Sequence, residues 1–214
     1  MNTRQLLPAA VIALIAIVTS CLLSSVRADE PNFRPLFDGK SLAGWHVIGG
    51  GKWTIEEGVL HGKNVASEPK HGHLVTDDQY GDFTARLKYK SIAGNSGLYF
   101  RIEKVLGDVG VKGFQAEIDA ANDIGGLYET NGRAWVVKPT AEQVKKYFKP
   151  GDWNEMTVTA HGRDITVTVN GVVTAQLKND PGRTTGYLAL QLHGGQDCEV
   201  YFKELEISGE VSPR

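Results

Sequence analysis

Three polar side chains alternate with apolar ones near the middle of the chain, and together they could bind or react with a sugar. In the stretch 113–119, Gln115, Glu117 and Asp119 alternate with phenylalanine, alanine and isoleucine. Two-residue alternation is typical of a strand with one buried and one wet face. We therefore expect these three polar groups to point outward from one sheet surface.

A second stretch, 95–101, shows the same alternation and could supply further polar groups to that surface. Gly97, Tyr99 and Arg101 fall on one face by the two-residue rule. If the two stretches pair as strands, a phenol ring and a guanidinium lie beside two carboxylates and an amide. This combination predicts a surface that handles sugars.

The segments that position these residues are mostly strands. Alternating or β-branched runs separated by turn signals occupy residues 53–56, 59–61, 83–89, 156–160, 165–169, 172–175, 186–193 and 200–207. Glu57-Gly58 and Asn170-Gly171 are typical hairpin turns. One helix is expected over residues 141–147, where Thr140 and Gln143 can form a capping box. Many short strands with a turn about every ten residues favour an all-β, two-sheet antiparallel sandwich.

Composition indicates one soluble domain without affinity for nucleic acid. The chain has 214 residues, of which 41% are hydrophobic and 22% charged, enough for an ordinary core. The net charge of −2 provides no field that would attract phosphates, so no nucleic-acid partner is expected. The sequence does not indicate an oligomeric state.

The first residues have the pattern of an export signal. Arg4 precedes an apolar run over residues 9–23, and small residues flank Arg27 before Asp29. We predict a signal peptide over residues 1–28 and a single domain over 29–214, in a periplasmic or secreted protein. The apolar run is short for a membrane span. Lipoprotein anchoring through Cys21 is the less favoured alternative.

Cysteine usage fits an exported protein that has no disulfide framework. Loss of Cys21 with the signal peptide would leave Cys198 alone, and one cysteine cannot form a bridge within the chain. Acidic residues flank Cys198 and oppose formation of its thiolate. We therefore interpret it as a small buried or edge residue and not as a nucleophile.

Several motifs, in this order and spacing, resemble the 3-keto-disaccharide hydrolase family, also called DUF1080. They lie at residues 36–45, 95–97 with Arg101, 151–154, 170–171 and 190–194. The resemblance spans about residues 33–207. It implies a concanavalin-like jelly roll and action on glycosides whose C3 hydroxyl has already been oxidised to a ketone by another enzyme. Family members are associated with 3-keto-glycoside 1,2-lyase and 3-keto-2-hydroxy-glucal hydratase chemistry.

The implied reaction needs a base near C2, because the C3 ketone acidifies the C2 proton, and a donor to the developing enolate. Glu117, Asp119 and His193 are candidate bases, and Arg101 and Gln115 are candidate donors. Many family members carry Glu and Gln where this chain has Gln115 and Glu117, so the identity of the base stays open. The candidate substrate-binding residues for an oligosaccharide or glycoside are Gln115, Asn95, Tyr99, Tyr128, Trp135 and Gln191.

Two other functions are compatible with the same residues. Glu117 and Asp119 resemble the start of the Glu-x-Asp-x-x-Glu signature of laminarinase-type glycosidases, but Asn122 stands at the third position and cannot act as a general acid. Without any catalysis, Tyr99, Tyr128 and Trp135 could stack on sugars in a glycan-binding module.

Some residues also have plain structural interpretations. Trp45, Trp53 and Trp153 are expected in the core. Arg101 could pair with an acidic neighbour, Glu103 or Glu117, as readily as with a substrate.

The sequence contains no clear cofactor motif. His71 and His73 lie in a polar stretch and lack an evident third ligand, so we expect a mobile surface loop and no zinc site there. A divalent ion held by Glu117, Asp119 or His193 would favour an enolate, and the sequence leaves this open. No phosphate-binding glycine loop precedes a helix, so no nucleotide cofactor is expected.

Overall fold

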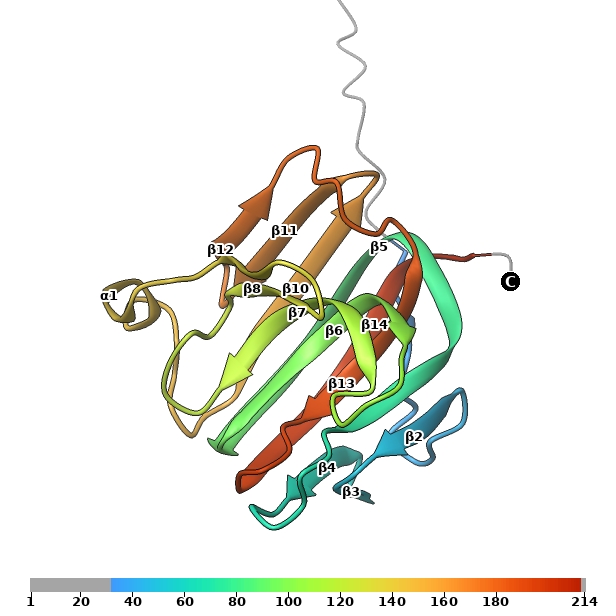
Figure 1. Cartoon of the computed structure of the whole chain (residues 1–214), viewed down its shortest axis with the longest axis vertical. Helices are drawn as coiled ribbons and strands as arrows, with labels where there is room; N and C mark the ends of the chain where they lie inside the picture. The colour runs from blue at the N-terminus through green and yellow to red at the C-terminus, as the bar shows by residue number, and fades with distance from the viewer. Residues whose placement is uncertain (1–31, 213–214) are drawn as a thin grey trace, which may run out of the picture. The chain divides into compact units, whose positions relative to one another are not determined.

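The computed structural model describes residues 32–212, which form one continuous antiparallel sheet of 14 strands folded into two layers (Figure 1). The predicted signal peptide, residues 1–28, lies outside the described residues and stays a prediction. The described part of the chain contains no helix of the length and hydrophobicity needed to cross a bilayer.

The front layer has the strand order β2-β5-β13-β6-β7-β8-β9. Its strands are β2 (Trp45–Gly49), the first part of β5 (Gly72–Ala93), β13 (Gly186–Leu192), β6 (Asn95–Lys104), β7 (Val111–Asp119), β8 (Leu127–Thr130) and β9 (Ala134–Val137).

The back layer has the order β12-β11-β10-β5-β14-β4-β3, and β1 pairs with Glu206 and Ile207 in the second half of β14. Its strands are β12 (Val172–Leu177), β11 (Asp164–Val169), β10 (Asn154–His161), the second part of β5, β14 (Cys198–Val211), β4 (Val59–Asn64), β3 (Lys52–Glu56) and β1 (Arg34–Pro35). Because β5 is 22 residues long, it pairs in both layers and joins them. The predicted all-β, two-sheet antiparallel sandwich is confirmed.

The core lies between the layers and is built by the alternation expected from the sequence. Phe114, Ala116 and Ile118 of β7 all belong to it. Phe100 of β6 stacks on Phe114 with ring centroids 5.4 Å apart, and Phe83 of the back layer meets Phe100 edge-on at 6.0 Å. The opposite face of β7 is thereby left to polar side chains.

The predicted local signals are largely confirmed. Glu57 with Gly58 and Asn170 with Gly171 form tight hairpin turns, in which all four residues have the positive φ that such turns need. The helix α1 (Ala141–Val144) is shorter than expected, but its capping box between Thr140 and Gln143 is present.

Cys198 is buried and free, as expected. Burial raises the pKa of its thiol to about 11, and the thiol donates a hydrogen bond to the backbone carbonyl of Asn95. The structure therefore supports its interpretation as a packing residue.

The expectation that Gly97, Tyr99 and Arg101 share one strand face is wrong at its last member. The pairing of β6 with β7 shifts between Phe100 and Glu103, and Arg101 has a φ of 51°. A bulge of this kind turns the following side chain away from the face predicted by simple alternation. Arg101 therefore leaves the surface that Tyr99 occupies.

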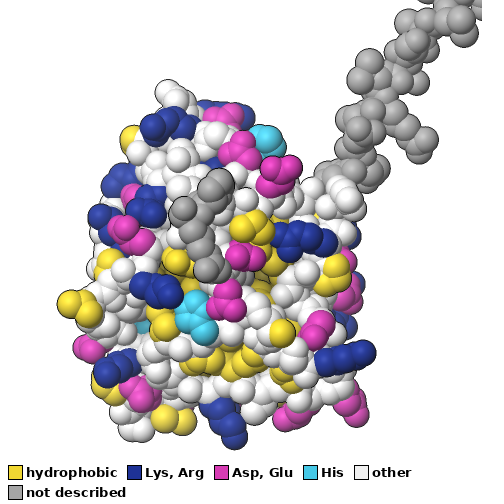
Figure 2. All heavy atoms as spheres, turned by 90° about the vertical axis from the view of Figure 1, so that its right-hand side faces the viewer, with side chains coloured by type: hydrophobic (Ala, Val, Ile, Leu, Met, Phe, Trp, Pro, Cys, Tyr) yellow, Lys and Arg dark blue, Asp and Glu magenta, His cyan; other side chains and the backbone are white. Residues whose placement is uncertain are grey.

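The charges on the surface are mixed in sign. On the face drawn in Figure 2, basic and acidic side chains are interspersed, in keeping with the small net charge of −2.

Candidate active site

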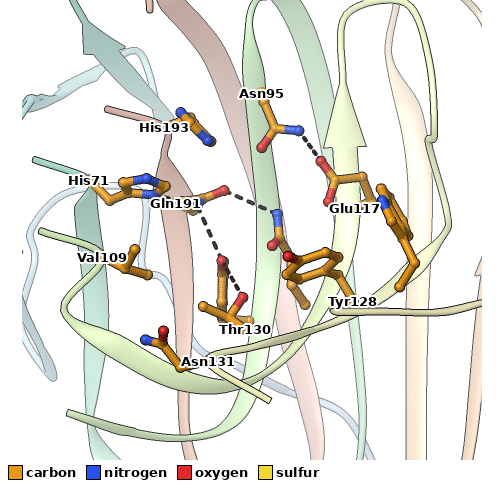
Figure 3. Close-up of a pocket in the computed structure, with 12 residues that line it drawn as sticks. His71, Asn95, Val109, Glu117, Tyr128, Thr130, Asn131, Gln191 and His193 are labelled. Carbon is orange, nitrogen blue, oxygen red and sulfur yellow. Dashed lines mark hydrogen bonds between the residues drawn. The ribbon is translucent and has the colours of Figure 1, made fainter. Parts of the chain in front are cut away.

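A pocket of about 380 Å³ lies on the face of the front layer that points away from the core (Figure 3). This volume is within the range of sites that bind small molecules. It is lined by His71, Asn95, Tyr99, Val109, Gln115, Glu117, Tyr128, Thr130, Asn131, Trp135, Gln191 and His193.

The floor of the pocket is set by strand register. Gln191 of β13 lies opposite Gly97 of β6, which in turn lies opposite Glu117 of β7. A Cβ atom at Gly97 would approach Gln115 to 2.7 Å, closer than Cβ contacts normally occur. Gly97 therefore keeps the centre of the floor low and leaves room for the side chain of Gln115.

Glu117 stands on this floor as a deeply buried carboxyl group. Only 3% of the residue is exposed, and its Oε1 accepts a hydrogen bond from Asn95. Burial raises the pKa of Glu117 well above its ordinary value, and the charges of Asp119 and Asp123 add to this rise against the opposing hydrogen bond from Asn95. The expectation of a wet strand face is corrected here, because Gln115 and Glu117 line a recess.

Amide and hydroxyl groups form a hydrogen-bond network beside Glu117. The Nε2 of Gln115 donates to the Oε1 of Gln191 at 3.1 Å, and the Nε2 of Gln191 donates to the hydroxyl of Tyr99 at 3.2 Å. That hydroxyl is also within 2.9 Å of the Thr130 hydroxyl. The structure thus brings together Gln115, Tyr99 and Gln191, and it adds Thr130, which the sequence did not suggest.

Two histidines form one side of the pocket. The rings of His71 and His193 are 4.1 Å apart between centroids and are inclined by 48°. Burial lowers the pKa of His71 to about 4, and the neighbouring His193 contributes to this lowering. The expected mobile surface loop at His71 and His73 is wrong, because one lines the pocket and the other lies within β5.

His73 is completely buried, and neither of its ring nitrogens has a hydrogen-bond partner among the described residues. Its ring meets Tyr99 edge-on at 5.3 Å. Burial, followed by the influence of His71, lowers the pKa of His73 to about 3. The native protein therefore holds this imidazole in its neutral form.

Replacement of His73 by phenylalanine is expected to reduce the sensitivity of the fold to acid. Between the ordinary pKa of 6.5 and the lowered value of about 3, the unfolded chain binds a proton that the native state does not. Stability therefore falls as the pH drops through this window, and phenylalanine removes this contribution. Melting temperatures from pH 7 to 4 should decline less steeply in the variant; an equal decline would contradict the assignment.

Asp119 lies at the end of β7 and is not among the residues that line the pocket. Its Oδ1 accepts hydrogen bonds from the backbone N–H groups of Ala121 and Asn122, at 2.8 and 3.0 Å. The structure thus uses Asp119 to close a turn and does not bring it to the pocket as a second carboxylate.

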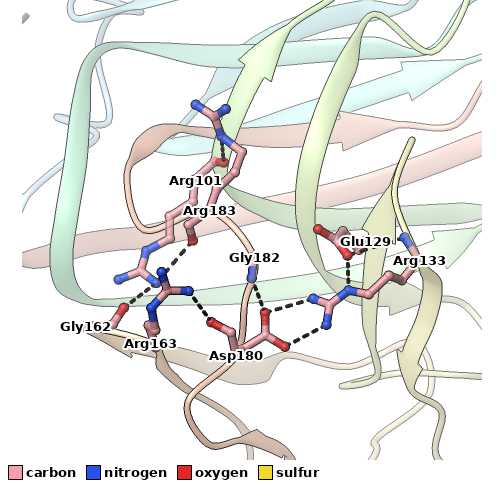
Figure 4. Close-up of polar contacts among 8 residues, drawn as sticks. All are labelled: Arg101, Glu129, Arg133, Gly162, Arg163, Asp180, Gly182 and Arg183. Carbon is pink, nitrogen blue, oxygen red and sulfur yellow. Dashed lines mark hydrogen bonds and ion pairs between the residues drawn. The ribbon is translucent and has the colours of Figure 1, made fainter.

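Arg101 is also outside the pocket and performs a structural role instead (Figure 4). Its guanidinium donates to the backbone carbonyls of Gly81 at 3.0 Å, Gly162 at 2.9 Å and Arg183 at 3.4 Å. It also pairs with the exposed carboxylate of Asp82 at 3.4 Å. Its expected role as an enolate donor is therefore not supported by its position.

Aromatic rings form the remaining side of the pocket. Tyr128 and Trp135 line it together and meet edge-on with centroids 5.3 Å apart. Of the three tryptophans expected in the core, Trp45 is buried, whereas Trp53 packs at the border of the core and Trp153 lies partly exposed beneath Lys90 and Lys203.

The described residues contain no group of three or more histidine, cysteine, aspartate or glutamate side chains placed to hold a metal ion. Among the described residues that line the pocket, Glu117 is the only acid. The pocket therefore combines one buried carboxyl group, two histidines, several amide and hydroxyl groups and an aromatic wall.

The comparisons with known proteins agree with this architecture. A candidate glycosyl hydrolase from Parabacteroides distasonis has a similar structure, with a TM-score of 0.62 and 22% identity over 83% of this chain and 94% of its own. A protein of unknown function with a galectin-like fold from Bacillus subtilis has a TM-score of 0.62 and 12% identity, over 85% of this chain and 96% of its own. A carbohydrate-binding module from Bacillus subtilis has a TM-score of 0.59 and 16% identity, over 78% of this chain and 96% of its own. At these identities the similarity shows the fold, a jelly-roll sandwich.

A comparison with curated proteins found no match. In contrast, residues 32–208 match the family model described as a 3-keto-alpha-glucoside-1,2-lyase-like domain. The chain therefore belongs to this family, and its membership supports a carbohydrate-related role.

Proposed function

We propose that the protein cleaves 3-keto-glycosides by elimination and rehydration, with Glu117 as the base that removes the C2 proton. The observation that carries this proposal is the single buried carboxyl group at the centre of a polar, sugar-sized pocket. Family membership supports the choice of substrate.

The proposed reaction proceeds through an enolate. Glu117 takes the C2 proton, and the electrons of that bond form a double bond to C3 while the ketone oxygen becomes an enolate. The enolate then expels the C1 substituent, whose oxygen takes a proton from solvent, and leaves a 2-hydroxy-3-keto-glycal. Addition of water returns a proton to C2 and places a hydroxyl on C1, so that the net reaction is hydrolysis.

Burial suits Glu117 to the role of base. A desolvated carboxylate is a stronger base than an exposed one, because uptake of a proton removes a charge that the site solvates poorly. Its hydrogen bond with Asn95 fixes the direction of the carboxyl group. After its proton exchanges with solvent, the same group can protonate C2 in the hydration step.

The other lining residues fit a sugar ring. The two hydrogens of the Gln115 amide nitrogen point to Ser96 and Gln191, and the Oε1 of Gln115 makes no hydrogen bond within the described residues. That oxygen can accept a hydrogen bond from a substrate hydroxyl. Tyr128 and Trp135 offer an apolar wall against which the ring can pack.

The geometry favours elimination over the two-carboxylate mechanism of ordinary glycosidases. That mechanism needs a nucleophile or base and a separate acid on either side of the glycosidic bond. The pocket offers Glu117 alone, since Asp119 is engaged in its turn. Elimination next to a ketone needs no strong acid, so one carboxyl group is sufficient.

Incubation of the purified protein with a 3-keto-disaccharide and with its unoxidised parent tests the proposal. We expect release of monosaccharide from the keto sugar alone, and loss of this release with a chelator would add a divalent metal to the proposed mechanism. Cleavage of the parent sugar would overturn the proposal in favour of ordinary hydrolysis. Binding of either sugar without turnover would identify a glycan-binding module instead.

A further inference from the structure

We propose that His71 and His193 are held in opposite tautomers, so that His71 presents an Nε2–H donor and His193 presents an unprotonated Nε2 acceptor. Both rings line the same pocket, and their centroids are 4.1 Å apart. The tautomers follow from hydrogen bonding alone, whereas their use in catalysis rests on the proposed function.

The tautomer of His71 is set by a chain of hydrogen bonds, here called the relay, that runs from the Ser96 carbonyl through Gln115 and Gln191 to His71. The carbonyl oxygen of Ser96 can only accept, so the Gln115 atom 3.2 Å away is its amide nitrogen. The second hydrogen of that nitrogen points to Gln191, whose nearby atom must therefore be its oxygen. This orientation places the Gln191 nitrogen 2.9 Å from the Nδ1 of His71.

The amide nitrogen of Gln191 can only donate, so the Nδ1 of His71 accepts and carries no proton. The proton of the neutral ring is then on Nε2, which makes no hydrogen bond within the described residues. The lowered pKa of His71, caused first by burial, agrees with a neutral ring at physiological pH. His71 is therefore a donor that keeps its proton.

The other hydrogen bonds of Gln191 and Tyr99 are consistent with this orientation of the Gln191 amide. The second hydrogen of the Gln191 nitrogen goes to the hydroxyl of Tyr99, which then donates its own proton to Thr130. Gln191 and Tyr99 are each 1% exposed, so water does not compete for these bonds. Reversal of the Gln191 amide would set its nitrogen against the nitrogen of Gln115, which is also a donor. Reversal of both amides would set the Gln115 oxygen against the carbonyl oxygen of Ser96, which is also an acceptor.

His193 receives the opposite assignment from its own neighbour. Its Nδ1 lies 2.6 Å from the backbone carbonyl of Gly194, which can only accept. The Nδ1 of His193 therefore carries the proton, and in the neutral ring its Nε2 holds a free lone pair. The backbone of His193 is itself fixed by a hydrogen bond from its N–H to the carbonyl of Asn95.

In the proposed reaction, His71 and His193 have separate roles, and both differ from the role of Glu117. The Nε2–H of His71 donates to the C3 oxygen as it becomes an enolate and stabilises it without transfer of a proton. The Nε2 of His193 accepts a proton from the water that adds to C1. Gln115 and Gln191 act as positioning residues for His71.

Long-range ¹H–¹⁵N NMR of the imidazole rings at pH 7 tests the assignment without a substrate. The signals are assigned by comparison with His71→Asn and His193→Asn variants. We expect a protonated Nε2 and an unprotonated Nδ1 for His71, and the reverse for His193. The same tautomer in both rings, or a protonated Nδ1 in His71, would overturn the proposal.

Gln191→Glu tests the relay, because a carboxylate cannot donate to Nδ1. We expect the proton of the neutral His71 ring to move from Nε2 to Nδ1 and kcat for a 3-keto-glycoside to fall about 10²-fold with little change in KM, as for the loss of one preorganised donor. Gln176→Glu, at an exposed position of β12, is the matched control and should change neither. An unchanged His71 spectrum in Gln191→Glu would contradict the relay.

The two proposals can fail separately. If the spectra show the predicted tautomers but no 3-keto-glycoside is cleaved, the arrangement of the histidines stands and the proposed function fails. If the keto sugar is cleaved but the tautomers differ from those predicted, the inference about the histidines alone is overturned.

Discussion

Replacement of Glu117 by glutamine is expected to lower turnover of a 3-keto-glycoside by a factor of about 10²–10⁴, the usual contribution of a general base. Glutamine has nearly the same shape and can keep a hydrogen bond to Asn95, but it cannot take the C2 proton. Binding of the sugar should therefore change little. Steady-state kinetics and calorimetric titration of the variant measure the two effects separately.

The Glu117→Gln variant should also be more stable than the native protein at neutral pH, so unfolding would not explain its loss of activity. Above the ordinary pKa of 4.5 the unfolded chain releases the Glu117 proton, while the native state retains it until the pH reaches the raised pKa. Native stability therefore falls as the pH rises through this window, and glutamine avoids that loss. We expect a melting temperature higher by about 2 °C or more at pH 8. The gain should disappear below about pH 4.

Glu142→Gln is the matched control for Glu117→Gln, since it makes the same chemical change at an exposed position of α1. Glu142 is 80% exposed, pairs with Lys145 on the surface and does not line the pocket. We expect turnover close to that of the native protein. An equal loss in both variants, or no loss in Glu117→Gln, would remove Glu117 from its proposed role.

Replacement of Arg101 by methionine is expected to destabilise the fold by about 3–5 kcal/mol, because buried carbonyl groups lose a charged donor. The residue is 1% exposed, and its guanidinium connects the backbone at Gly81, Gly162 and Arg183. For a domain of this size, the melting temperature should fall by about 10 °C. Below the new transition, kcat should remain close to the native value, because Arg101 does not reach the pocket.

Lys178→Met is the control for Arg101→Met. Lys178 is 67% exposed and pairs with Asp164 at 2.7 Å on the surface, so its loss should cost less than about 1 kcal/mol. Thermal unfolding and kinetics of both variants distinguish the two roles proposed for Arg101. A large fall in kcat with an unchanged melting temperature in Arg101→Met would restore Arg101 as a catalytic candidate.

The fold and one face of the site could be predicted from sequence because simple alternation holds along β7. Gln115 and Glu117 share a face opposite Phe114, as expected. Alternation does not report how much that face is covered. The neighbouring strands and loops bury it, so a predicted wet surface is a recess in which a carboxyl group has a raised pKa.

The errors arose where local backbone geometry or long-range pairing decides the outcome. A bulge after Phe100 turns the Arg101 side chain away from the pocket face, and no residue type in that stretch predicts a bulge. His71 was missed because its stretch reads as polar, although His71 and His73 alternate directly before Leu74 and Val75. That spacing indicates a strand. The pairing of His73 with Gln191 places this strand beside the site.

The most direct test of the central claim is to cleave a 3-keto-glycoside in D₂O and to measure deuterium at C2 of the released 3-keto sugar. Elimination through an enolate, followed by addition of water, predicts deuterium at C2 in the product of the native protein. Incorporation should fall together with turnover in Glu117→Gln. Full cleavage with hydrogen retained at C2 would contradict the account, because the C1 bond would then break without removal of the C2 proton.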